Sequence, residues 1–150
     1  MDTSQYLDLF IDETKEHLQS LNEHILVLEK EPENKDVINE IFRAAHSLKG
    51  MAGTMGFKKM QRLTHDMENV FQEVRNDNIK VNSNLIDILF NCLDAIEEYL
   101  ETVKATSDEG DNGNEALIQQ LNDYLNGGSA PVEAAPEKAV VQEEVPSESK

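Results

Sequence analysis

Positive charge is scarce in this sequence of 150 residues. Lys and Arg together number 13 against 30 Asp and Glu, so the formal net charge is −17 at pH 7. A protein that binds nucleic acid must offer cations to displace the counterions around the phosphates. Docking on an anionic membrane surface also depends on basic residues. The charge therefore argues against both partners and suits a basic protein partner better, although acidity often serves solubility alone.

Cysteine and long apolar runs are also scarce. The one cysteine, Cys92, has no second cysteine with which to form an internal disulfide, which favours a reducing compartment. Residues 1–5 have neither the basic region nor the apolar region of a secretion signal. No apolar run approaches the roughly 20 residues needed to span a bilayer. These absences predict a cytoplasmic protein.

Apolar residues recur at helical spacing through most of the sequence, and no segment alternates as a strand does. The stripes predict four amphipathic helices, spanning about 7–28, 38–55, 60–74 and 83–103. Short polar turns separate them, and Ser83 is a suitable N-cap for the fourth. Four such helices predict an all-α fold, an up-and-down antiparallel four-helix bundle.

The fourth predicted helix is apolar on a second side, at Ile86, Phe90 and Leu93. We expect a fifth, shorter helix to cover that side. It follows the linker 107–113 and presents four apolar side chains, Leu117, Ile118, Leu121 and Leu125.

The composition changes at Gly127. Residues 127–150 are rich in Pro, Ala and Glu and cannot bury a core, which predicts a flexible, disordered acidic linker. The folded domain is therefore expected to span 1–126. Because the chain ends inside this linker, we expect further domains downstream.

His46 is the main candidate for chemistry. It lies on the flank of the buried stripe of the second helix, beside Arg43, Lys49, Gly50 and Gly53. Each helix-interior glycine costs about 1 kcal/mol relative to alanine. We interpret the open space that the glycines leave as access for the active site of a partner protein.

A neutral imidazole keeps a nucleophilic lone pair on one nitrogen and needs a partner on the other to fix its tautomer. The third helix offers His65 and Glu68, one turn apart on one flank. A carboxylate that accepts from Nδ1–H would orient the ring and raise the basicity of Nε2. Lys49, one turn beyond His46, would neutralise charge on an incoming phosphoryl group.

Two motifs in this sequence resemble those of a known protein family. The run 42–50, FRAAHSLKG, resembles the phosphorylation motif of histidine phosphotransfer (HPt) domains, most of all the N-terminal domain of CheA-type chemotaxis histidine kinases. Residues 63–68 match the family's second motif, on the next helix as expected. Two motifs in register are more specific than His-x-x-Lys-Gly alone. The resemblance covers roughly residues 2–126.

The resemblance implies that His46 is phosphorylated, that Glu68 accepts a hydrogen bond from its ring, and that Lys49 and His65 are supporting polar groups. The phosphoryl group would come from a separate kinase domain of the same protein, which binds ATP and Mg²⁺ and acts in trans within a dimer. It would pass to an aspartate of a response-regulator receiver domain. The isolated domain is expected to need no cofactor and to have no catalytic activity alone, since it lacks a Gly-rich phosphate loop.

Other interpretations stay open from the sequence. The domain could be a stand-alone phosphorelay carrier, an adaptor bundle without chemistry, or a zinc site with His46, His65 and Glu68 as ligands. Gly50 and Gly53 could mark close helix packing rather than partner access. A lysine such as Lys49 on a helix surface is most often only solvated.

Overall fold

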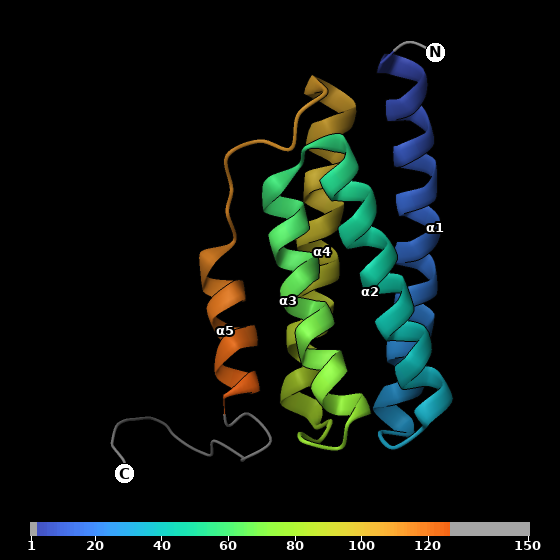
Figure 1. Ribbon diagram of the computed structural model, residues 1–150, viewed down its shortest axis with the longest axis vertical. Helices are drawn as coiled ribbons and strands as arrows, with labels where there is room; N and C mark the ends of the chain where they lie inside the picture. Colours follow the sequence, from blue (N-terminus) through green and yellow to red (C-terminus); the bar gives the residue numbers. More distant parts are fainter. Residues whose placement is uncertain (1–2, 127–150) are drawn as a thin grey trace.

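The computed structural model describes residues 3–126, and this part of the chain consists of helices joined by short connections. The helices, labelled in Figure 1, are α1 (Thr3–Lys30), α2 (Lys35–Met55), α3 (Lys58–Arg75), α4 (Ser83–Thr106) and α5 (Glu115–Leu125). The predicted all-α fold is therefore confirmed. The predicted linker, residues 127–150, lies outside the described residues.

Helices α1 to α4 run alternately in opposite directions and form an antiparallel bundle, with α5 beside α3 on the outside (Figure 1). The predicted apolar stripes meet along the bundle axis. Side chains without exposed surface fill its centre, among them Leu21, Ile25, Leu28, Ile41, Leu48, Met60, Leu63, Met67, Phe71, Leu85, Leu89 and Ile96. Burial of each contributes about 1.5–3 kcal/mol. Within residues 3–126, no helix combines the length and apolar character that a membrane crossing requires.

Asparagine side chains cap two of the helices. Asn34 accepts from the Val37 amide at 3.2 Å, and Asn82 accepts from the Leu85 amide at 3.0 Å. The N-cap of α4 is thus Asn82, and the prediction of Ser83 was wrong by one residue. Both residue types cap helices well, so adjacent candidates cannot be separated from the sequence.

The start of α3 is capped from a distant part of the chain. Its N-cap residue, Phe57, makes no side-chain cap hydrogen bond. Instead the buried carboxylate of Glu109 accepts from the backbone amides of Lys59 and Met60, at 3.0 and 2.9 Å. A carboxylate here satisfies free amide groups and complements the positive end of the helix dipole. The contact also fastens the α4–α5 connection to the bundle.

Helix α5 packs against α3 and α4, with Ile118, Leu121 and Tyr124 buried. The Tyr124 hydroxyl donates to the carbonyl of Lys80, in the α3–α4 connection. The fifth helix is confirmed, and it packs onto the bundle.

The side of α4 that α5 covers differs from the prediction. Phe90 and Leu93 line a groove between α4 and α1. The start of α5 lies beside Asn91, Ala95 and Glu98 of α4 instead. The apolar stripe of α4 was wide because α4 packs against α1 there.

Candidate functional site

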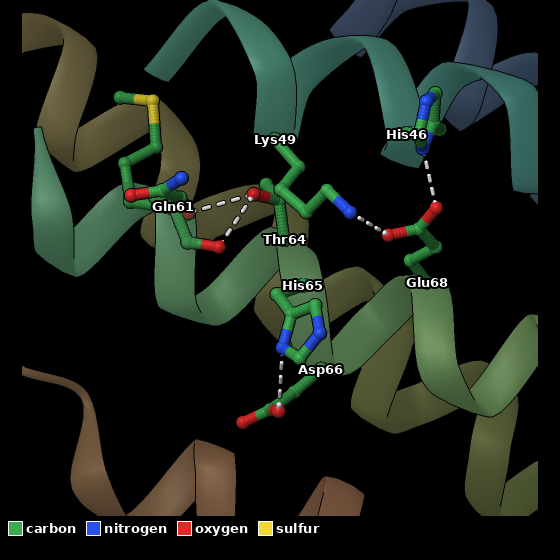
Figure 2. A network of polar contacts seen from close by, with 8 residues as sticks. His46, Lys49, Gln61, Thr64, His65, Asp66 and Glu68 are labelled. Atoms are coloured by element: carbon green, nitrogen blue, oxygen red, sulfur yellow. Dashed lines mark hydrogen bonds and ion pairs between the residues drawn. The ribbon is translucent and has the colours of Figure 1, made fainter. Parts of the chain in front are cut away.

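His46 lies near the middle of α2 with 62% of its side chain exposed. Its Nδ1 is 2.5 Å from Oε2 of Glu68 on α3 (Figure 2). Because a carboxylate only accepts, this contact requires Nδ1 to carry the proton. In that tautomer Nε2 of the neutral ring has the free lone pair. The exposed ring is therefore held in a form whose nucleophilic atom is defined.

Glu68 joins two side chains of α2. Its second oxygen, Oε1, is 2.7 Å from Nζ of Lys49, one helical turn beyond His46. Only 9% of the Glu68 side chain is exposed. Its burial opposes ionisation, but the hydrogen bonds from Lys49 and His46 outweigh burial and hold the pKa of Glu68 below its usual range. The carboxylate is therefore charged when the ring is neutral.

The close approach of α2 and α3 sets these distances. The chain reverses at Gly56, whose φ of 78° suits glycine, so the two helices run antiparallel. A Cβ built on Gly53 would lie 2.6 Å from Nε2 of Gln61 on α3. Gly53 therefore leaves room for the end of the Gln61 side chain, which favours the packing interpretation for this glycine.

Gly50 differs from Gly53 in its surroundings. A Cβ built on Gly50 would meet no atom within 4 Å. Together with His46 it lines an open groove between α2 and α1. Two large apolar side chains of α1 that are half exposed, Tyr6 and Leu9, line the same groove. Tyr6 and Leu9 were not predicted as part of the site, because neither belongs to a sequence motif.

His65 lies apart from the other three predicted polar residues. Figure 2 shows its ring pointing away from the contacts of His46, Lys49 and Glu68. Its Nδ1 is 3.8 Å from Oδ1 of Asp66. Burial raises the pKa of Asp66, and the positive charges of His65 and Arg62 offset part of that rise.

The side chains before His46 on α2 differ in their roles. Arg43 is exposed and pairs with Glu40 at 2.8 Å. The ring of Phe42 lies nearly parallel to the His46 ring, and the guanidinium of Arg75 lies over Phe42. Neither Phe42 nor Arg75 was predicted as part of the site. The four-residue spacing of Phe42 and His46 was the signal that could have linked them.

A metal site finds little support in this geometry. Among residues 3–126, no group of three or more His, Cys, Asp and Glu side chains is arranged to hold a metal ion. His65 lies outside the contacts of His46 and Glu68, so the three proposed zinc ligands do not converge. The geometry suits proton placement and nucleophilic chemistry at His46 better.

Known proteins are similar to this chain in sequence and in fold. The Hpt domain family model matches residues 5–106. The chemotaxis protein CheA of Bacillus subtilis is 44% identical over 142 residues, which cover 95% of this chain and 21% of that protein. This chain thus spans about a fifth of the length of that relative.

Two solved structures are also similar to this chain. The CheA phosphotransferase domain from Thermotoga maritima is 48% identical with a TM-score of 0.67, covering 69% of this chain and 98% of that one. The phosphorylated P1 domain of CheA3 from R. sphaeroides, solved in complex with CheY6, has a TM-score of 0.77 over 83% of this chain and 98% of that one. At 23% identity, the second likeness shows the shared fold alone.

Proposed function

This chain belongs to the Hpt domain family, and on that premise we propose that it is the phosphoacceptor and phosphocarrier domain of a chemotaxis histidine kinase. Nε2 of His46 receives the γ-phosphoryl group of ATP and passes it to an aspartate of a response regulator. The observation that carries the proposal is the contact between Nδ1 of His46 and Oε2 of Glu68, which leaves Nε2 as the nucleophile.

In the first step the Nε2 lone pair attacks the γ-phosphorus of ATP. The N–P bond forms as the bond to the bridging oxygen breaks, and ADP leaves with that electron pair. Because Nδ1 keeps its proton, the phosphorylated ring carries positive charge. The Glu68 carboxylate, 2.5 Å away, stabilises that charge as it develops.

In the second step a carboxylate oxygen of the receiver aspartate attacks the phosphorus. The N–P bond breaks, its electron pair returns to Nε2, and the neutral ring is restored. Lys49 supports both steps by holding Glu68, since its Nζ contacts Oε1 rather than open solvent. His65, whose ring faces Asp66, plays at most an indirect supporting part.

Access to His46 is from the α1–α2 side. The ring is exposed, Gly50 leaves open space beside it, and both line the groove that Tyr6 and Leu9 border. Two partners use this access in turn: a kinase domain that holds ATP and Mg²⁺, acting in trans within a dimer, and a receiver domain. The similarity to the chemotaxis protein CheA of Bacillus subtilis supports these partners.

The domain organisation of the protein follows from the same proposal. The Hpt domain spans residues 1–126, and residues 127–150 connect it to the kinase domain. The length of the Bacillus subtilis relative, about five times that of this chain, supports downstream domains over a stand-alone carrier. The protein acts in the cytoplasm.

The test is to incubate the domain with a separately expressed kinase core and labelled ATP. We expect label that is acid-labile and alkali-stable, lost in His46→Gln and kept in the matched variant His65→Gln. Addition of a receiver domain should discharge it. An unlabelled domain, with a core active on another Hpt domain, would overturn the proposal, and so would label that survives in His46→Gln.

A further inference from the structure

Glu68 fixes one atom of an otherwise exposed ring. A single hydrogen bond at Nδ1 leaves the imidazole free to tilt about that contact, and 62% of the His46 side chain is exposed. A second restraint is therefore needed if Nε2 is to point in one direction.

The ring of Phe42 lies nearly parallel to the His46 ring. The centroids of the Phe42 and His46 rings are 6.4 Å apart and their planes differ by 10°. This separation lies within the range of interacting aromatic pairs. The two residues are four apart on α2, so the helix itself places their side chains on one face.

Arg75 holds Phe42 from the opposite helix. Its Cζ lies 4.4 Å from the centroid of the Phe42 ring, which is a cation–π contact. Arg75 is the last residue of α3, where a cation also complements the helix dipole. Phe42 is thus fixed by its own packing and by a charge from α3.

The two restraints come from one face of α3. Glu68 and Arg75 are seven residues apart, two helical turns, so both face α2. Because α2 and α3 are antiparallel, the step from Glu68 forward to Arg75 runs in the same direction along the bundle as the step from His46 back to Phe42. Glu68 holds the ring directly, and Arg75 holds it through Phe42.

We propose that Phe42 is a positioning residue for phosphoryl transfer, that it sets the direction of the His46 ring, and that Arg75 holds it in place. The proposal rests on the proposed function, since it assigns an orienting role toward the same nucleophile. Neither residue touches the transferred group.

Variants of the domain, assayed with a kinase core, test the proposal. Phe42→Leu removes the ring and keeps an apolar side chain, and Arg75→Gln removes the cation. Phe90→Leu is the matched control for a half-buried phenylalanine, in the α1–α4 groove. Arg62→Gln is the matched control for an exposed arginine on α3.

We expect Phe42→Leu to lower kcat for phosphorylation by roughly 3- to 10-fold with KM unchanged, because the nucleophile is misdirected and docking is not. Arg75→Gln should lower kcat by less. NMR of His46 should show one Nδ1–H tautomer in Phe42→Leu and in both controls, because Glu68 still fixes it, and a more mobile ring in Phe42→Leu alone. Phe42→Tyr, which keeps the ring, should restore kcat.

An unchanged kcat in folded Phe42→Leu overturns the proposal, as does a rise in KM alone, which would make Phe42 a docking contact. If Phe42→Leu does not fold, Arg75→Gln provides the test, because Arg75 is exposed and its replacement does not open the core. An unchanged kcat in Arg75→Gln then overturns the role of Arg75 and with it the proposal. Wild-type protein that takes no label would instead overturn the proposed function, so the two failures are distinguishable.

Discussion

Glu68 fixes both the tautomer and the position of the His46 ring. It is nearly buried, yet each carboxylate oxygen meets a donor of its own, His46 Nδ1 at 2.5 Å and Lys49 Nζ at 2.7 Å. Removing one donor would leave a buried acceptor unpaired, which is costly. The three side chains therefore form one unit rather than two independent pairs.

Replacement of Glu68 by glutamine should slow the phosphorylation of His46 by roughly 10- to 100-fold. Glutamine has one acceptor oxygen and an NH₂ group, so it cannot accept from both His46 and Lys49. The ring loses its fixed tautomer and the anion that stabilises the phosphorylated form. The rate with a kinase core measures this effect, with Glu73→Gln, further along α3, as the control. A rate within twofold of wild type would contradict the role given to Glu68.

Glu68 and Asp66 of α3 should change the free energy of unfolding with pH in opposite directions. The pKa of Glu68 is lowered, so its stabilising contribution is present above the unfolded value near 4.5 and is lost as the pH falls through its folded pKa. The pKa of Asp66 is raised by burial, so its charged form destabilises the fold above that pKa. Thermal unfolding from pH 3 to 7 should show Asp66→Asn more stable than wild type at pH 7, with the gain shrinking toward pH 3. Glu68→Gln should be less stable at pH 7, and that deficit should also shrink toward pH 3. A pH-independent difference would refute this account for either residue.

At the scale of elements, the contact between α2 and α3 places His46, and Gly50 and Gly53 of α2 differ in their relation to it. Gly53 leaves room for the Gln61 side chain of α3, whereas Gly50 faces open space. A helix-interior glycine without a packing reason weakens the helix. The cost at Gly50 is the one best explained by partner access.

Gly50→Ala should therefore stabilise the domain by about 0.5–1 kcal/mol, because the added methyl group meets no atom and the helix gains propensity. Gly53→Ala should gain less, since the end of the Gln61 side chain must move. Urea unfolding of both variants measures the difference. Equal gains would show that the close approach at Gly53 is not limiting.

The α4–α5 connection is fastened to the bundle at the start of α3. Glu109→Gln should destabilise the domain by about 1–2 kcal/mol, because a neutral amide accepts less strongly from the amides of Lys59 and Met60. Hydrogen exchange should quicken at those two amides. Glu98→Gln, an exposed change on α4, is the control. Unchanged exchange at Lys59 and Met60 would contradict the capping role.

At the scale of the whole molecule, local patterns predicted more than long-range contacts did. The apolar stripes predicted the helices and the bundle because helical periodicity is local. His46 and Glu68 were predicted together because the position of each on its own helix follows from local periodicity. Antiparallel packing of the two helices then brings the two side chains into contact.

The contacts that the sequence did not predict join distant segments. Glu109 caps a helix about 50 residues away, as its contact with Met60 spans 49 positions, and no local pattern encodes such a cap. The spacing of Phe42 fits the core stripe of α2, so its contact with Arg75 of α3 could not be predicted from the sequence. His65 shares a flank with Glu68 on a helical wheel, yet its side chain turns to Asp66.

The central claim is that Nε2 of His46 takes the phosphoryl group while Nδ1 keeps its proton toward Glu68. Nitrogen-15 and phosphorus-31 NMR of the phosphorylated domain, labelled at histidine, tests it most directly. We predict phosphorus coupled to Nε2 of His46 and a protonated Nδ1. Phosphorus on Nδ1, or on a residue other than His46, would contradict the account.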